Sequence, residues 1–477
     1  MNLKKKLFIN GEWIESEEYY ELRSPYTSEK IADIPLANTT EVNNAVETAN
    51  AVQKTWKKSS KYERSVILEK LSDLYQKNID EAAQIISLES SKPLKDAYKE
   101  IERTVQTFKF AAEEAKRIDG ETISIDAAPG GEGRRGYTIF EPIGVIGAIT
   151  PFNFPINLVA HKVGPAIAGG NTIVLKPANQ TPLSSFYLAK LLKEAGLPDG
   201  VLNVVSGDGS STGNAIVEHK NVDLITFTGS PTVGEVIKQN SGLKKVILEL
   251  GSNSAVIIDK DVEISQKLID RCITGAFSSN GQVCISLQRI YIHATKYEEF
   301  LERFVQSAGD LKLGNPMDIE TDISALISQK ELSSKLKLIK ESVCEGIKIA
   351  SGNEIVDGKI LKPTIVLQPN QSSKILQEEV FAPVVSVITF DDISNAINLV
   401  NDSKYGLQAG IYTNDVRVAN HAIENLEVGG VLINDIPTFR LDHMPYGGVK
   451  DSGTGREGIK YAIKEMSEMK LVIWNNN

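Results

Sequence analysis

Three side chains in this sequence have the types needed for covalent catalysis on a carbonyl group. Cys284 supplies a thiol within residues 280–286 (Asn-Gly-Gln-Val-Cys-Ile-Ser), and Glu249 supplies a carboxylate 35 positions earlier. Asn153 adds an amide within residues 151–155 (Pro-Phe-Asn-Phe-Pro). A thiol can attack the carbonyl carbon, an amide can stabilise the resulting oxyanion, and a carboxylate can act as a base. Together they predict a nucleophilic enzyme acting on a carbonyl substrate.

The other cysteines and the histidines predict no second chemistry. Cys272 and Cys344 are interpreted as small buried apolar residues, and three cysteines cannot all form pairs. The cysteine spacing and the five scattered histidines fit no metal-ligand pattern, so no metal site is expected.

The composition is that of an ordinary globular enzyme. A chain of 477 residues is too long for one hydrophobic core, so two or three domains are expected. The net charge of −10, from 52 basic and 62 acidic residues, argues against nucleic acid or an anionic membrane as the main partner. With no run of 18 apolar residues and no signal-peptide core, the sequence indicates a cytoplasmic protein.

The elements that must position these groups alternate between strands and helices. Residues 60–117 have helical periodicity, with one apolar stripe through Ile101, Val105, Phe108 and Ala112, and a Gly-rich break at 127–136 predicts a projecting hairpin or connector. From 143 to 259, β-branched runs at 145–149, 172–175, 202–205, 224–227, 246–248 and 255–258 alternate with helices such as 182–195. This pattern predicts a parallel sheet covered on both faces, which would bind a nucleotide at the carboxyl ends of its strands.

A second α/β domain is expected over residues 260–445, with helices at 263–280 and 296–310 and strands at 289–292 and near 364, 384 and 430. The tail from 465 to 474 ends in an apolar strand that a monomer would leave as an exposed edge. Since such an edge needs a partner, we expect an oligomer.

Two segments have features that suit a dinucleotide. The strand at 224–227 runs into Gly229 and Ser230 at the start of a helix, where free N–H groups and the helix dipole suit a pyrophosphate. Considered alone, this segment is more typical of a helix cap, and only in the context of the sheet does a phosphate site become an equal alternative. Lys176 ends another strand, where it could meet a ribose or a 2′-phosphate, or could be a solvated lysine.

Taken in order, these motifs resemble those of the aldehyde dehydrogenase superfamily over essentially the whole chain. The matching segments are 151–155 (Pro-Phe-Asn-Phe-Pro), 176–177 (Lys-Pro), 227–230 (Phe-Thr-Gly-Ser) with Gly234, 248–251 (Leu-Glu-Leu-Gly), 281–284 (Gly-Gln-Val-Cys), 378–381 (Glu-Glu-Val-Phe) and 445–450 (Pro-Tyr-Gly-Gly-Val-Lys).

The resemblance implies an α/β, aldehyde dehydrogenase-like fold. A Rossmann-type NAD(P)-binding domain would span 1–119 and 143–251, and an α/β catalytic domain would span 252–455. A small β oligomerisation arm would combine 120–142 with 456–477, in a homodimer or homotetramer.

The resemblance also implies roles for the catalytic residues. Cys284 would be the nucleophile, Glu249 the base that hydrolyses a thioester, Asn153 the side-chain half of the oxyanion hole, and Lys162 a proton-relay residue. A buried Glu249 with a raised pKa would suit this work.

The cofactor and tunnel residues follow in the same way. Lys176 would bind the adenosine ribose, Ser230 with Gly229 the pyrophosphate, Glu379 the nicotinamide ribose, and Phe381 would pack against the nicotinamide. Phe154 and Tyr446 resemble walls of a substrate tunnel.

One departure from the family pattern concerns the cofactor. Asn179 stands where NAD-preferring members commonly have glutamate, and an amide cannot repel a 2′-phosphate. Lys176 with Ser210 or Ser211 could hold that phosphate, so we expect NADP to be accepted, although an Asn179 hydrogen bond to the ribose would still favour NAD.

Two smaller departures carry less information. Ser252 replaces the usual second glycine and would place a hydroxyl near Glu249, and Phe152 replaces a common tryptophan without a predicted consequence.

The substrate is predicted from two arginines. Arg440, just before Tyr446, could bind a distal carboxylate, phosphate or sulfonate, or could instead form a salt bridge with Asp442 or Asp435. Arg103 could be a second anion contact or part of a solvated helix face.

The Arg440 segment resembles that of the lactaldehyde, sulfolactaldehyde and non-phosphorylating glyceraldehyde-3-phosphate dehydrogenases. Val283 precedes the nucleophile where phosphate-oxidising members often have arginine, so a small hydroxyaldehyde is the leading substrate. Glyceraldehyde-3-phosphate or succinate semialdehyde is the alternative. A CoA-acylating enzyme and a non-catalytic binding protein are rival interpretations that the presence of Glu249, Cys284 and Asn153 disfavours.

Overall fold

Short apolar runs build an eight-stranded sheet in the first half of the chain. The computed structural model describes residues 4–475, so the outermost residues of the predicted terminal domains lie outside the described residues. The strand order is β2-β1-β9-β8-β7-β10-β11-β23. The parallel centre consists of β9 (Leu202–Val204), β8 (Thr172–Lys176), β7 (Val145–Ile149), β10 (Leu224–Thr228) and β11 (Lys245–Glu249). Antiparallel β1 (Leu7–Ile9), β2 (Glu12–Ile14) and β23 (Gly453–Thr454) form the edges.

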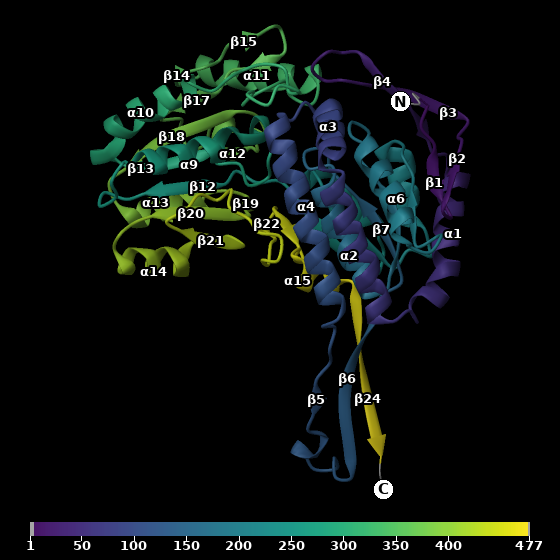
Figure 1. Ribbon diagram of the computed structural model, residues 1–477. Coiled ribbons are helices and arrows are strands. Elements are labelled where there is room, and N and C mark those ends of the chain that lie inside the picture. Colours follow the sequence, from purple (N-terminus) through teal and green to yellow (C-terminus); the bar gives the residue numbers. More distant parts are fainter. Residues whose placement is uncertain (1–3, 476–477) are drawn as a thin grey trace.

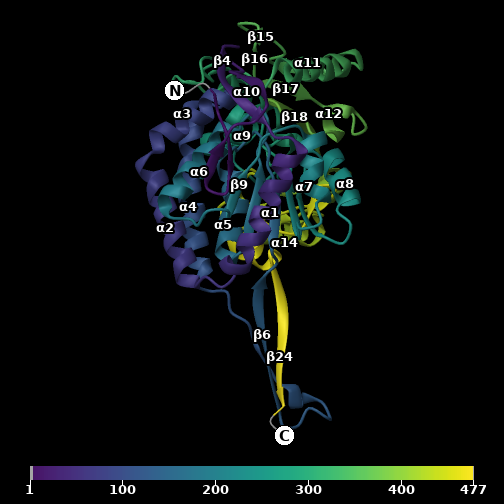
Figure 2. The same ribbon diagram turned by 90° about the vertical axis from the view of Figure 1, so that its right-hand side faces the viewer.

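Helices cover both faces of this sheet, as the nearly continuous burial of its central strands requires (Figures 1 and 2). One face packs against α5 (Asn157–Gly169) and α6 (Leu183–Ala195), with α2 (Lys61–Lys77), α3 (Ile79–Ser90) and α4 (Leu94–Ala115) outside them. The other face packs against α1 (Thr39–Trp56), α7 (Asn214–Glu218) and α8 (Pro231–Asn240).

The predicted helical stretch 60–117 is thus three helices. The chain turns between α2 and α3 at Asn78, and between α3 and α4 at Ser91, which adopts a left-handed φ of 57°, followed by Pro93. The predicted apolar stripe of α4, including Ile101 and Phe108, is fully buried.

A seven-stranded sheet forms the second α/β unit, in the order β14-β17-β18-β13-β12-β20-β21. Its strands are β14 (Lys348–Ser351), β17 (Thr364–Leu367), β18 (Val384–Phe390), β13 (Arg289–His293), β12 (Ala255–Ile258), β20 (Gln408–Tyr412) and β21 (Gly430–Ile433). One face packs on α9 (Gln266–Phe277) and α10 (Tyr297–Gly309), the other on α13 (Ile393–Asn401) and α14 (Val416–Asn425). Helices α11 (Gln329–Cys344) and α12 (Lys374–Gln377) flank the β14 side.

The periodicity over 143–259 groups the strand 255–258 with the first sheet, and that grouping is wrong; the resemblance instead implies that this strand belongs to the segment 252–455. β12 lies between β13 and β20 in the second sheet, because the chain crosses from one sheet to the other directly after β11. A buried apolar run has the same sequence pattern in either sheet, so periodicity could not distinguish them. Conversely, β23 lies within the predicted catalytic segment 252–455 but pairs with β11 of the first sheet.

A narrow three-stranded sheet projects from the body (Figures 1 and 2). It consists of β5 (Thr122–Ile123), β6 (Arg134–Pro142) and β24 (Ser467–Asn475), reached through α15 (Ile459–Glu465). The Gly-rich stretch 127–136 lies at the outer end of this sheet and leads into β6. β24 pairs with β6 over its whole length and forms the edge of the sheet, as the apolar tail predicts.

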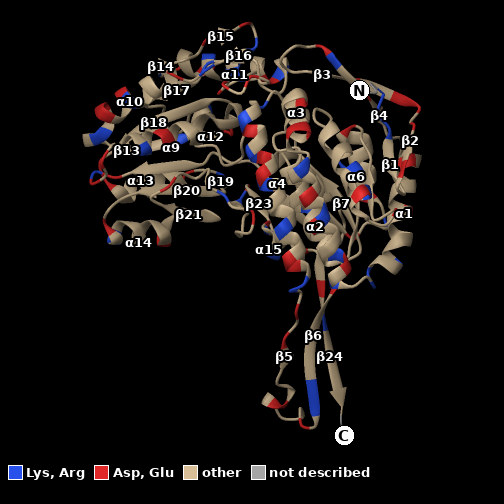
Figure 3. Ribbon diagram, viewed as in Figure 1, with Lys and Arg blue, Asp and Glu red and all other residues tan. Residues whose placement is uncertain are grey.

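Three two-stranded sheets complete the fold: β3 (Glu18–Arg23) with β4 (Lys30–Leu36), β15 (Ile355–Val356) with β16 (Ile360–Leu361), and β19 (Tyr405–Gly406) with β22 (Val449–Lys450). Acidic and basic residues are interspersed along α2 and α4 instead of forming a basic stripe (Figure 3). Within residues 4–475, none of the helices has the length and apolar character needed to cross a membrane.

The two minor cysteines differ from each other. Cys272 is buried in α9, as predicted, whereas Cys344 is exposed at the end of α11, so the prediction of burial is wrong there. The apolar face of α11 is set by Leu332 and Ile339, and Cys344 falls off that face.

Candidate active site

Parallel strands bring four predicted residues to one edge of the first sheet. Lys176 and Glu249 are the last residues of β8 and β11, while Asn153 follows β7 and Ser230 follows β10. Because the carboxyl ends of parallel strands share an edge, residues far apart in sequence become neighbours. Cys284 reaches this edge from the second unit, in the loop before β13.

The loop that carries Cys284 is held in an unusual backbone conformation. Ser279, Asn280 and Gly281 have successive positive φ values of 52°, 60° and 68°. A Cβ on Gly281 would lie 2.2 Å from the Ala382 carbonyl oxygen, so only glycine fits there.

Buried hydrogen bonds maintain this loop. The Asn280 amide donates to the Ser91 and Ala325 carbonyls (both 3.1 Å) and accepts from the Ser324 N–H (2.7 Å). The Ser279 N–H donates to the Asp96 carboxylate at 2.9 Å, which ties the loop to α4.

Asn153 lies against the same loop. Its side-chain amide donates to the backbone carbonyl of Gln282 at 3.0 Å, two residues before Cys284. The predicted oxyanion donor and the predicted nucleophile are therefore neighbours.

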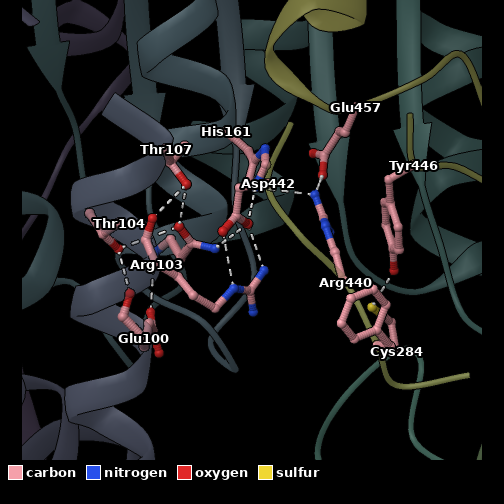
Figure 4. Close-up of polar contacts among 12 residues, drawn as sticks. Glu100, Arg103, Thr104, Thr107, His161, Cys284, Arg440, Asp442, Tyr446 and Glu457 are labelled. Atoms are coloured by element: carbon pink, nitrogen blue, oxygen red, sulfur yellow. Dashed lines mark hydrogen bonds and ion pairs between the residues drawn. The ribbon is translucent and has the colours of Figure 1, made fainter. Parts of the chain in front are cut away.

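The Cys284 thiol meets a tyrosine hydroxyl that has an arginine stacked on its ring (Figure 4). The Cys284 Sγ lies 2.9 Å from the Tyr446 hydroxyl, and the Arg440 guanidinium carbon lies 3.6 Å from the Tyr446 ring centre. Burial raises the pKa of the thiol to about 11, while the Tyr446 hydroxyl and the Arg440 charge act in the opposite direction.

Glu249 is buried, and neither of its carboxylate oxygens has a hydrogen-bond partner among the described residues. Burial raises the pKa of Glu249 well above its ordinary value, and the neighbouring Glu457 carboxylate adds to the rise. Because it has no hydrogen-bond partner among the described residues, the Glu249 carboxyl group is available to a water molecule. The Ser252 hydroxyl, expected near this base, instead meets the Ser254 hydroxyl at 3.0 Å.

A buried ion cluster adjoins Glu249. Glu457 accepts from Lys162 at 3.1 Å and from Arg440 at 3.1 Å, and Lys162 also donates to the Thr226 hydroxyl at 3.0 Å. Burial opposes ionisation of Glu457, but Lys162 and Arg440 outweigh it and hold its pKa well below the ordinary range. The alternative of an Arg440 salt bridge to Asp442 or Asp435 is wrong, since Arg440 pairs with Glu457.

Asp442 binds Arg103 instead (Figure 4). Arg103 donates through Nε (3.2 Å) and Nη2 (2.6 Å), and the same carboxylate contacts His161 at 2.8 Å and Asn157 at 3.1 Å. Arg103 is about one-third exposed and is therefore neither a fully solvated residue nor a free cation. Asp435 pairs with Arg271.

A cavity of about 180 Å³ opens over the thiol. Its lining includes Cys284, Phe154, Tyr446, Arg103 and Arg440. The predicted nucleophile, both predicted tunnel residues and both predicted anion contacts thus line one small cavity.

The opposite side of the edge fits a dinucleotide. Ser230 begins α8, but its hydroxyl makes no capping bond and is exposed, so the first turn of α8 is open to a phosphate. The free N–H group expected at Gly229 is occupied, because it donates to the Glu249 carbonyl at 3.0 Å. The buried Thr228 hydroxyl has no partner among the described residues and is left for a ligand.

The remaining cofactor residues lie along the same edge. The Glu379 carboxylate accepts from the Ser252 N–H at 3.0 Å, and burial raises its pKa to about 7. Phe381 adopts a left-handed φ of 53° and packs edge-on against Phe152, 5.8 Å between ring centres. Lys176 is buried, and Asn179 and Ser210 are near the surface.

Three site residues escape sequence reasoning: Glu457, His161 and Asn157. Each is a lone polar residue whose neighbours come from distant segments, so no local spacing marks it. Asn280 begins the Cys284 segment, but its anchoring hydrogen bonds were not predicted. Glu457 follows the 445–450 motif closely, and that position was the only available signal.

Comparison with known proteins identifies the family of this chain. The aldehyde dehydrogenase family model matches residues 13–472. The chain is 46% identical to a 3-sulfolactaldehyde dehydrogenase of Priestia aryabhattai over 98% of both chains. It is 42% identical to a lactaldehyde dehydrogenase of Methanococcus aeolicus, covering 98% of this chain and all of that one.

Solved structures superpose closely. Aldehyde dehydrogenase 21 from Physcomitrella patens, in complex with the reaction product succinate, matches with a TM-score of 0.97 and 37% identity over 100% of this chain and 99% of that one. A glyceraldehyde-3-phosphate dehydrogenase from Methanocaldococcus jannaschii, complexed with NADP, matches with a TM-score of 0.92 and 38% identity, covering 96% of this chain and 100% of that one. A betaine aldehyde dehydrogenase from Staphylococcus aureus, in complex with NAD+, matches with a TM-score of 0.95 and 30% identity, covering 100% of this chain and 98% of that one. The predicted fold is confirmed, and the chain belongs to the NAD(P)-dependent aldehyde dehydrogenase family.

Proposed function

We propose that this protein oxidises a small hydroxyaldehyde with a distal anionic group, of the sulfolactaldehyde type, to its carboxylic acid. The observation that carries the proposal is the small cavity that places Arg103 and Arg440 beside Cys284. Relatives named for 3-sulfolactaldehyde and lactaldehyde, at 46% and 42% identity, support the same substrate class.

In the proposed mechanism, the Cys284 thiolate attacks the aldehyde carbon and the carbonyl oxygen becomes an oxyanion. The Asn153 amide, already aimed at the loop of the nucleophile, and the Cys284 N–H donate to that oxyanion. Bound NAD(P)+ supplies the hydride acceptor that allows a thioester to form. Glu249 then takes a proton from water, which attacks the thioester and releases the acid.

Lys162 and Glu457 form the route for the proton that Glu249 must lose. The buried pair lies between Thr226 and Arg440, and the Glu457 carboxylate is close enough to Glu249 to raise the pKa of the latter.

The charged side chains that line the cavity are of both signs. Lys99, Arg103 and Arg440 are basic and Asp96 and Glu100 are acidic, while Arg103 and Arg440 are also paired with Asp442 and Glu457. The Arg440 Nε is buried without a partner among the described residues, so one donor of its fork remains for a substrate oxygen.

The test compares kcat/KM for sulfolactaldehyde, lactaldehyde, succinate semialdehyde and glyceraldehyde-3-phosphate in the wild type and in Arg440→Ala. An arginine bound to the distal anion predicts a loss of about 100-fold for sulfolactaldehyde and under about 10-fold for neutral lactaldehyde. Lys99→Ala, at the exposed mouth of the same cavity, is the matched control and should change kcat/KM little for either aldehyde. Equal losses for charged and neutral aldehydes would make Arg440 structural and leave a general small-aldehyde oxidiser.

Succinate semialdehyde is the second candidate. The same two arginines suit a carboxylate as well as a sulfonate, and the P. patens structure holds succinate. Glyceraldehyde-3-phosphate is less favoured, because Val283 and not an arginine lines the cavity beside the nucleophile.

We further propose that the protein works in the cytoplasm as a homodimer or homotetramer joined through the arm. Met469, Leu471 and Ile473 of β24 alternate along the strand and are each about half exposed, which makes one apolar row on an edge strand.

A further inference from the structure

A carboxylate, that of Asp208, lies beside Asn179, the amide residue that was expected to select the cofactor. The Asn179 side chain donates through Nδ2 to the Asp208 carboxylate at 3.1 Å, across 29 positions of sequence. The Tyr20 hydroxyl donates to the Asn179 carbonyl at 2.7 Å and fixes the backbone of the segment after β8. Asn179 thus has its amide group aimed at an exposed acid from the loop after β9.

Lys176, the cation expected to meet a 2′-phosphate, is buried and has one of its three donors occupied. Its ammonium donates to the Pro177 carbonyl at 3.2 Å, and the side chain is only 5% exposed. Burial lowers the pKa of Lys176 to about 8, while the charge of Asp208 acts in the opposite direction. The negative charge of Asp208 is therefore near enough to stabilise the ammonium form of Lys176.

The surface beside Asp208 is acidic as well. Asp208 and Ser211 border a cavity of about 300 Å³ whose lining also includes Glu17 and Glu18 and contains neither lysine nor arginine. A phosphate placed near Ser210 or Ser211 would meet these carboxylates, with the buried Lys176 as the neighbouring cation.

We propose that Asp208, oriented by Asn179, is a specificity-determining residue that accepts a hydrogen bond from the adenosine ribose and disfavours a 2′-phosphate. NAD+ is then the preferred cofactor, and NADP+ is accepted more weakly. The Asn179 Oδ1, buried without a partner among the described residues, is a second acceptor for the ribose hydroxyls. The proposal rests on family membership and does not depend on which aldehyde is oxidised.

The first test is direct binding to the full-length enzyme, measured by titration calorimetry with 5′-AMP and 2′,5′-ADP, which differ only in the 2′-phosphate. The wild type is expected to bind 5′-AMP more tightly. In Asp208→Asn, a neutral isostere, the affinity for 2′,5′-ADP should rise about tenfold, while that for 5′-AMP falls by no more than about threefold. The ratio of kcat/KM for NADP+ to that for NAD+ should rise by the same factor.

Glu17→Gln is the matched control, since it neutralises an exposed carboxylate of the same cavity that makes no hydrogen bond or ion pair with Asn179 or Lys176 in the described structure. If it raises the 2′,5′-ADP affinity as much as Asp208→Asn does, general surface charge accounts for the selectivity and the role of Asp208 is overturned. An unchanged ratio in Asp208→Asn, or a wild type that already prefers 2′,5′-ADP, would also overturn it. Aldehyde specificity is not involved in either readout.

Discussion

Cys284 is half-buried beside the cavity, and its neighbours Tyr446 and Arg440 favour ionisation of its thiol. Burial raises its pKa to about 11, and the Tyr446 hydroxyl and the Arg440 charge restrain the rise. Tyr446, predicted as a tunnel wall, also contacts the predicted nucleophile through its hydroxyl, and the face of its ring packs on Arg440.

Tyr446→Phe should slow alkylation of Cys284 by iodoacetamide about tenfold at about pH 8, because the thiolate loses a donor and its pKa rises. The rate, followed across pH by mass spectrometry, should increase with pH in both proteins and be displaced to higher pH in the variant. Tyr75→Phe, which removes a buried hydroxyl without a partner in the described structure, is the control. An alkylation profile unaffected by Tyr446→Phe would contradict the proposed contact.

Glu249 leads to a second prediction at this scale. Its pKa is raised, so the ionised base is lost as pH falls through a value above the ordinary one of about 4.3. Thioester hydrolysis should therefore increase with pH through that raised pKa. Glu249→Gln should lower steady-state turnover at least about 100-fold and remove this pH dependence, while rapid-quench measurements still show one equivalent of reduced cofactor per chain. A variant that retains the pH-dependent turnover would exclude Glu249 as the base.

At the scale of elements, the reactive loop depends on its anchors. Asn280 makes three buried hydrogen bonds to the chain around Ser91, Ser324 and Ala325, and it does so with a left-handed backbone. The loop before β13 is thereby joined both to the end of α3 and to the segment before α11.

Asn280→Ala should lower the free energy of unfolding by about 3 kcal/mol, because it leaves buried polar groups without partners and places alanine at positive φ. Urea unfolding followed by circular dichroism measures this change. Asn353→Ala is the control, since Asn353 has a similar φ of 59° but is exposed. Comparable losses in the two variants would show that backbone strain, and not the Asn280 network, stabilises the loop.

At the scale of the whole molecule, the site exists only because two sheets meet. Asn153, Lys162 and Glu249 belong to the first unit, and Cys284 to the second, while Arg440 and Tyr446 lie on the segment that returns from the second unit to the first. Arg103 of α4 and Asp442 join that returning segment to the helical layer.

The projecting arm leads to the prediction for this scale. Replacing Leu471 and Ile473 together by Asp should lower the solution mass, measured by light scattering, towards that of one chain, because charges would occupy the apolar edge row. Glu468→Lys, on the opposite face of the same strand, should leave the mass unchanged. An unaltered mass in the double variant would show that the arm does not hold the oligomer together.

The sequence by itself determined the strand–helix alternation, the family, and the chemical types at Cys284, Glu249 and Asn153. These follow from local periodicity and from motifs contained within a few residues. The tertiary structure alone decided that β23 belongs to the first sheet, that Gly229 has no free N–H, and that Arg440 pairs with Glu457. It also decided that Asp208 stands beside Asn179. The physical reason is the same in each case: hydrogen bonds and ion pairs depend on distance in space, and residues up to hundreds of positions apart come within about 3 Å only when the chain is folded.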